Sequence, residues 1–282
     1  MDLKLIKQLC KYDKDQLRIQ ITKFLFDHGY EHIYKGKNGA FIFAEGTLPI
    51  CLIAHMDTVF KTPPLEEDFL YDSRKKVLWA PGGSGYDNRA GIYSIMQIIC
   101  AGFMPSVIFT DDEEKGCIGA KALVKAIPKC PFKDCKCLIQ LDRANHNDSV
   151  FYDCANENFE TFINKYGFET DIGSFSDISV IAPAWGIAAV NLSIGYLDEH
   201  TDNERLVCSW CDETIVKVKK ILTDAKNKGI KFYEYVPFKY NFFAGDHCLI
   251  CNNSLNGNSH LITGANSIPY HICENCYHQY YT

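Results

Sequence analysis

The chain has 282 residues, of which 47% are hydrophobic and 23% are charged, and its net charge is −6. This composition excludes a disordered or collagen-like protein and predicts one large domain with a small appendage. The acidity offers no general attraction to nucleic acid or to an anionic membrane. The 14 cysteines are unusual, and the charged N-terminal segment has no signal-peptide pattern, so we expect reduced thiols and metal ligands in a cytoplasmic protein.

The predicted elements alternate between helices and strands. A helix spans residues 16–26, and a hairpin follows at 32–43, where Lys37-Asn38-Gly39 is typical of a tight turn. A wholly apolar run, typical of a strand covered on both faces, lies at 49–54, and similar runs recur at 106–110, 137–141 and 187–192. Further helices are predicted at 89–101, 120–127 and about 212–226. This alternation predicts an α/β fold with a central, mostly parallel sheet flanked by helices.

One uncharged stretch, from residue 178 to residue 197, is long enough to suggest a membrane helix. Pro183, Gly186 and Gly195 interrupt it. We therefore interpret it as a loop leading into a buried strand, and we expect no membrane segment.

Polar side chains follow the predicted strands. His55-Met-Asp57 follows the first apolar run, Asp111-Asp-Glu-Glu114 the second and Asp142 the third, while His200 lies beyond the fourth and Asp87 precedes a helix. Each residue alone is typical of a solvated surface, but the carboxyl ends of parallel strands share one sheet edge. So many carboxylates at one edge need a cation. The mixed nitrogen and oxygen donors favour zinc, with manganese or cobalt as alternatives.

Five motifs occur in a characteristic order along this part of the chain. Together they resemble the zinc-dependent exopeptidase superfamily with co-catalytic metals, which contains aminopeptidases, carboxypeptidases and deacylases. The motifs are Ala54-His-Met-Asp-Thr-Val59, Gly85-Tyr-Asp-Asn-Arg-Ala-Gly91, Thr110-Asp-Asp-Glu-Glu-Lys-Gly116, Leu141-Asp-Arg143 and His200-Thr-Asp-Asn-Glu204.

The resemblance implies two zinc ions held by five side chains. His55 and Asp142 would bind one metal, Glu114 and His200 would bind the other, and Asp87 would bridge the two. We therefore expect a dinuclear centre made without cysteine.

The resemblance also implies catalytic roles for two further carboxylates. Asp57 would orient a metal-binding histidine, and Glu113 would be the general base for a water activated by the metals. The expected reaction is hydrolysis of an amide or peptide bond without a covalent intermediate.

The family divides according to what is inserted into this core. The interval between Asp142 and His200 is too short for a separate lid domain plus the returning strands, and Phe175-Ser-Asp177 resembles the lidless aminopeptidase branch, whose usual His is Ile178 here. We expect an aminopeptidase acting on small peptides. The alternatives are a deacylase or carboxypeptidase-like amidohydrolase acting on N-acyl small molecules, and a non-catalytic zinc-binding scaffold, against which the intact Glu113 argues.

The C-terminal part has a different composition. Cys248-x-x-Cys251 and Cys273-x-x-Cys276 supply the four thiolates of a closed, structural zinc site. From residue 229 onward Lys231 is one of only two cationic residues, which argues against nucleic-acid binding and favours a structural or protein-docking role. The predicted organisation is a catalytic domain at 1–228, an aromatic-rich linker at 229–247 and a zinc ribbon-like module at 248–282.

Overall fold

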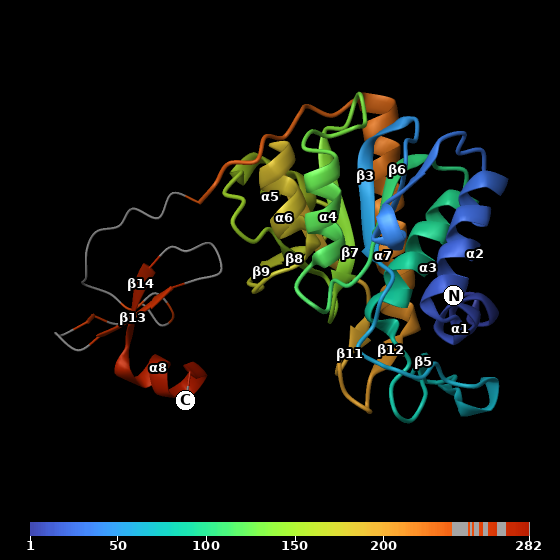
Figure 1. Ribbon diagram of the computed structural model, residues 1–282, viewed down its shortest axis with the longest axis horizontal. Helices are drawn as coiled ribbons and strands as arrows, with labels where there is room; N and C mark the ends of the chain where they lie inside the picture. Colours follow the sequence, from blue (N-terminus) through green and yellow to red (C-terminus); the bar gives the residue numbers. More distant parts are fainter. Residues whose placement is uncertain (239–247, 249, 251–253, 256–258, 264–268, 282) are drawn as a thin grey trace. The chain divides into compact units, whose positions relative to one another are not determined.

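The computed structural model describes residues 1–238, 248, 250, 254–255, 259–263 and 269–281, and Figure 1 shows its helices and strands. The chain divides into two compact units, Met1–Phe238 and Lys239–Thr282. Among the described residues, none of the helices combines the length and apolar character that crossing a membrane requires.

The first unit contains seven α-helices among its described residues. They are α1 (Leu3–Lys11), α2 (Lys14–Asp27), α3 (Tyr86–Cys100), α4 (Ile118–Ala126), α5 (Glu157–Asn164), α6 (Asp177–Trp185) and α7 (Cys208–Lys228).

Two sheets accompany these helices. The strands of the main sheet are β1 (Ile33–Lys35), β2 (Phe41–Ala44), β3 (Leu48–His55), β6 (Pro105–Thr110), β7 (Cys137–Arg143), β8 (Asp148–Val150), β9 (Glu169–Asp171) and β10 (Ala189–Ser193). Those of the smaller sheet are β4 (Leu70–Asp72), β5 (Val77–Trp79), β11 (Tyr196–Leu197) and β12 (Arg205–Val207).

The main sheet has the strand order β1-β2-β6-β3-β7-β10-β8-β9. Its four central strands, β6, β3, β7 and β10, pair in parallel, whereas the β1–β2, β2–β6 and β10–β8 pairs are antiparallel. The expected α/β fold with a mostly parallel centre is therefore confirmed. Because the central strands point the same way, the residues that follow them emerge at one edge.

Helices cover both faces of this sheet (Figure 1). Alternate residues of β3 enter different cores: Leu52 and Ala54 pack in the core that includes α3 and α7, whereas Cys51 and Ile53 pack in the core that includes α4 and α6. All four side chains are fully buried. A strand buried on both faces needs apolar residues at every position, which is why its sequence is a continuous apolar run.

The hairpin expected near the N-terminus is present. Strands β1 and β2 pair antiparallel, with Tyr34 opposite Phe43. Asn38 and Gly39 between them have φ angles of 56° and 73°, the left-handed values that Asn-Gly sequences adopt with little strain.

The uncharged stretch 178–197 differs from the expected loop, because its first part belongs to helix α6. Ser176 forms a capping box at the start of the helix, and Gly186, with a φ angle of 68°, ends it. Ile178 and Ile181 are buried one helical turn apart in the same core as α4. The expected loop was wrong here because Pro183 is accommodated inside the helix.

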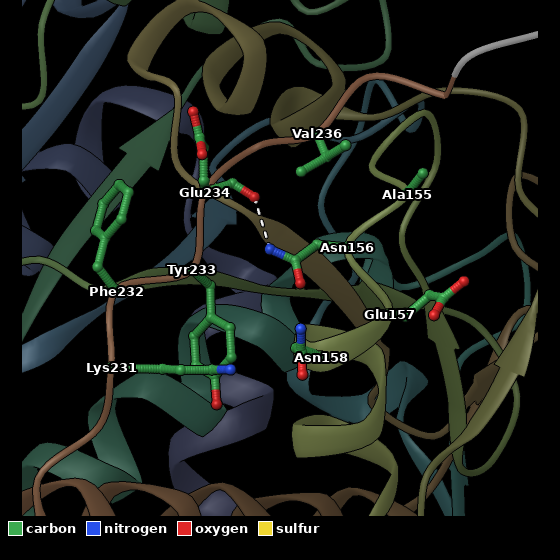
Figure 2. A pocket seen from close by; sticks show the side chains of 9 residues that line it. All are labelled: Ala155, Asn156, Glu157, Asn158, Lys231, Phe232, Tyr233, Glu234 and Val236. Atoms are coloured by element: carbon green, nitrogen blue, oxygen red, sulfur yellow. Dashed lines mark hydrogen bonds between the residues drawn. The ribbon is translucent and has the colours of Figure 1, made fainter.

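Residues 229–238 belong to the first unit and pair with its other segments. The Tyr233 N–H donates to the Lys136 carbonyl, and the Tyr233 carbonyl accepts from the Ala188 N–H. This segment and residues 155–158, at the start of α5, line an open pocket of about 370 Å³ (Figure 2). None of the predicted metal ligands lines it; its walls are Ala155, Asn156, Glu157, Asn158, Lys231, Phe232, Tyr233, Glu234 and Val236.

The described part of the second unit contains the antiparallel strands β13 (Ser259–Thr263) and β14 (Pro269–Cys273) and the helix α8 (Glu274–Tyr281). Its buried cluster consists of Cys248, Leu255, Ile272 and Cys276. Among the residues that the structure describes in this unit, two of the four members of the buried cluster are therefore cysteines.

Candidate metal centre

The five predicted metal ligands come together at one edge of the main sheet. His55 is the last residue of β3, and Asp142 lies near the end of the neighbouring parallel strand β7. Glu114 follows β6, Asp87 lies in the first turn of α3, and His200 follows β11. The site therefore lies at the carboxyl ends of parallel strands, where open α/β sheets bind their ligands.

The first group of ligands consists of His55, Asp87 and Asp142, whose donor atoms all lie within 4.8 Å of one another. His55 Nε2 is 3.0 Å from Asp87 Oδ1 and 3.1 Å from Asp142 Oδ1. All three side chains are buried. One imidazole nitrogen thus faces two carboxylates in a site that is largely closed to solvent.

The second group consists of Asp87, Glu114 and His200. His200 Nε2 is 3.1 Å from Asp87 Oδ2 and 3.0 Å from the Glu114 carboxylate. Asp87 belongs to both groups and presents a different oxygen to each. This is the arrangement that a carboxylate needs if it is to bridge two cations.

The donor set fits two divalent cations. Asp87, Glu114 and Asp142 bring three carboxylates together, and no lysine or arginine of the described residues forms an ion pair with any of them. Asp142 Oδ1 is buried and accepts no hydrogen bond of acceptable geometry, although His55 Nε2 is 3.1 Å away. Buried anionic oxygens without protein cations are satisfied by metal ions, and carboxylates with imidazoles suit zinc.

Asp57 connects the end of β3 to the loop that carries the other predicted carboxylates. Its Oδ1 lies 3.2 Å from His55 Nδ1 and accepts the Glu113 N–H at 3.0 Å, while its Oδ2 accepts the Glu114 N–H at 3.2 Å. Burial alone would raise the pKa of Asp57, but the imidazole and these two N–H groups lower it to about 2. The carboxylate stays ionised, and it orients the imidazole so that Nε2 faces the site.

Glu113 lies beside the two ligand groups and belongs to neither. Burial raises the pKa of Glu113 to about 8, and repulsion from Asp142 contributes in the same direction. The Cys117 thiol donates to Glu113 Oε1 at 3.6 Å. A carboxyl group that can hold a proton near neutral pH suits the transfer of protons.

The carboxylates also act on the two histidines. Hydrogen bonds to Asp87 and Glu114 raise the pKa of His200 to about 10. Burial opposes protonation of His55, but Asp142 and the other adjacent carboxylates outweigh it and raise the pKa of His55. The negative potential that favours these protons is the same potential that would attract a divalent cation.

Two side chains that the sequence analysis did not assign hold Asp142 in place. Gln140 Nε2 and Ser176 Oγ donate to Asp142 Oδ2 at 2.9 and 3.1 Å. The Ile178 N–H donates to Gln140 Oε1 at 3.1 Å. Residue 178, where the lidless aminopeptidase branch usually has a His, therefore contacts Gln140 through its backbone. The Ser-Asp segment was a recognisable signal for Ser176, whereas Gln140 stands inside an apolar run and gave none.

Three of the four C-terminal cysteines form another candidate metal site. The Sγ atoms of Cys248, Cys273 and Cys276 lie within 4.8 Å of one another. Cys251, the fourth predicted ligand, lies outside the described residues. The described thiols are therefore close enough to share one ion, as tetrahedral zinc sites require.

Comparisons with known proteins extend the structural argument. No protein-family model matches this chain, and no curated protein matches it by sequence. Among solved structures, the aminopeptidase PepT from Bacillus cereus ATCC 10987 is similar with a TM-score of 0.64 and 15% identity over 80% of this chain and 98% of that one.

Two further solved structures are similar. A tripeptidase from Staphylococcus aureus subsp. aureus Mu50 has a TM-score of 0.64 and 14% identity over 78% of this chain and 96% of that one. The aminopeptidase APDkam598 from the archaeon Desulfurococcus kamchatkensis has a TM-score of 0.56 and 16% identity over 79% of this chain and 94% of that one. The chain therefore has the fold of these aminopeptidases, as its resemblance to the zinc exopeptidases implied.

Proposed function

We propose that the protein is a dinuclear metallopeptidase that removes residues from the amino end of small peptides. The observation that carries this proposal is that Asp87 presents one oxygen to each of two ligand groups, with Glu113 beside them. The names of the similar structures, aminopeptidase and tripeptidase, support the substrate class.

We propose two zinc ions as the cofactors, with manganese or cobalt as alternatives, because the five ligands offer only imidazole nitrogen and carboxylate oxygen. His55 and Asp142 would hold one ion, Glu114 and His200 the other, and Asp87 both. Such ions, when bound, lower the pKa of a water molecule and stabilise the oxyanion that develops on the substrate carbonyl.

The chain's own residues would handle the protons. Glu113 would take the proton from the attacking water and deliver it to the leaving amine, because its carboxylate lies beside both ligand groups and burial, which raises its pKa, makes it a stronger base. Asp57 would keep this base in place through the Glu113 N–H while it orients His55.

The experiment that tests this proposal compares full-length, zinc-loaded wild type with Glu113→Gln on a panel of dipeptides and tripeptides. We expect hydrolysis of peptides with a free amine, and a loss of about 10²- to 10⁴-fold in kcat for Glu113→Gln because proton transfer is removed. The exposed Glu67→Gln is the matched control and should match the wild type. Equal rates for wild type and Glu113→Gln would reject the mechanism.

The same panel distinguishes the alternatives when each peptide is also supplied with its amine acetylated. Cleavage of the acetylated series alone would indicate a deacylase or a carboxypeptidase-like amidohydrolase. A zinc-loaded protein that cleaves neither series would indicate a binding scaffold.

For the second unit we propose one structural zinc, bound by Cys248, Cys251, Cys273 and Cys276. The proximity of the three described thiols supports this site. We further propose that the module docks a protein partner rather than nucleic acid, because its sequence has few cationic residues. Thiolate ligands need reducing conditions, so we propose the cytoplasm as its location.

A further inference from the structure

Glu204 is a buried carboxylate whose partners are backbone N–H groups. Its side chain is 0% exposed. Oε2 accepts hydrogen bonds from Ser84, Gly85 and Tyr86 at 2.9, 2.6 and 3.1 Å, and Oε1 accepts the Asp87 N–H at 3.1 Å. Four successive N–H groups at the start of α3 therefore converge on one anionic side chain, an arrangement that stabilises the negative charge.

The segment that Glu204 contacts is rich in glycine. Gly82, Gly83 and Gly85 have φ angles of 86°, 88° and 70°, which glycine adopts freely but at a high entropic cost on ordering. Glycines have no side chains with which to anchor a turn. Two residues after Gly85 comes Asp87, whose two oxygens face two different ligand groups.

Glu204 also lies in the same chain segment as His200, a predicted ligand of the second group. It follows His200 by four residues, and its own N–H donates to the Thr201 carbonyl at 3.1 Å. The carboxylate thus links the segment that carries one ligand of the second group to the backbone of another ligand of that group. Among the described residues, neither the Asp87 side chain nor the His200 side chain forms a hydrogen bond with a backbone group.

We propose that Glu204 is the positioning residue of the dinuclear centre: it fixes the backbone of residues 84–87 so that Asp87 can bridge the two metals. The inference deepens the proposed function, on which it rests for the identity of the ligands. It requires a group that only accepts hydrogen bonds, because all four partners are donors.

The variant Glu204→Gln tests this requirement with almost no change in shape. A glutamine can aim its one carbonyl oxygen at Ser84, Gly85 and Tyr86, but its NH₂ group then faces the Asp87 N–H, donor against donor. We expect the Asp87 peptide to move and both ligand groups to be disturbed. Residues that orient metal ligands through hydrogen bonds typically contribute about 10- to 100-fold to metal affinity.

The measurement is zinc affinity of the full-length protein by competition with a chelator, together with its folded state by circular dichroism. Glu204→Gln should bind zinc at the dinuclear centre about 10- to 100-fold more weakly than wild type. Zinc at the C-terminal cysteines should be unchanged and serves as an internal reference. The control is Asp72→Asn, because Asp72 also accepts two backbone N–H groups, from Arg74 and Lys75, but at a turn away from the ligands.

A second measurement keeps the inference testable if Glu204→Gln does not fold. In wild-type protein dialysed against chelator, the amides of residues 84–87 should exchange with deuterium much more slowly than those of the exposed residues 61–62. Rapid exchange at 84–87, or a folded Glu204→Gln that binds zinc as wild type does, would overturn the role of Glu204. Neither measurement needs a substrate, so their failure is distinct from an absence of peptidase activity.

Discussion

At the residue scale, the site depends on carboxylates that do two things at once. Asp57 orients His55 with one oxygen and also accepts the N–H groups of Glu113 and Glu114. Asp87 divides its two oxygens between two groups of ligands. Because each carboxylate has two acceptor atoms, one side chain can couple two segments that are distant in sequence.

Asp57→Asn tests this coupling. The amide keeps the size of the carboxylate but must place an NH₂ group against one of the donors that Asp57 now accepts. We expect the affinity for zinc at the dinuclear centre to fall about 10- to 100-fold, measured by chelator competition in the full-length protein. An affinity equal to that of wild type and of the Asp72→Asn control would show that the ligands do not depend on Asp57.

The predicted ligands could be proposed from sequence because they stand in five ordered motifs that follow the apolar runs or, for Asp87, lie near the start of a helix. The residues that hold these ligands in place could not be identified in this way. Gln140 lies within an apolar run of β7, where nothing distinguishes it from a core residue until its partner Asp142 is placed. Glu204 is one acid in a polar segment, and its role depends on N–H groups of residues 84–87, far away along the chain.

At the element scale, the central strands were the most predictable features, because strands covered on both faces have apolar residues at every position. The apolar runs became β3, β6, β7 and β10. Helix α6 was missed because Pro183 and a short length hid the helical spacing of Ile178 and Ile181. Helix α1 was also not predicted. Asp2 caps its N-terminus, and its buried residues pack into the main core.

At the scale of the whole molecule, the candidate metal sites of the two units differ in their side chains. The first brings together carboxylates and imidazoles, and the second brings together thiols. The boundary between the units lies after Phe238, because the preceding residues pair with the first unit through contacts such as Tyr233 with Ala188. Tertiary pairing of this kind has no local pattern in the sequence, and the aromatic composition alone suggested a linker.

Because the two candidate metal sites lie in different units and consist of different side chains, we predict that each can be lost independently of the other. Cys273→Ser removes one thiolate from the second unit and should lower the zinc content of the full-length protein by one equivalent, while the rate of peptide hydrolysis stays within about twofold of wild type, because Cys273 is not among the ligands of the dinuclear centre. Elemental analysis and the peptide assay measure the two quantities. Cys100→Ser, an exposed cysteine outside the thiol cluster, is the control. Parallel loss of activity and zinc would contradict independent sites.

If two metal ions share Asp87, anomalous diffraction at the zinc edge should locate both of them. Crystals of the full-length protein grown with zinc should show two anomalous peaks at the edge of the main sheet. One peak should lie among His55, Asp87 and Asp142, and the other among Asp87, Glu114 and His200. A single peak there, or none under zinc-replete conditions, would contradict the dinuclear centre.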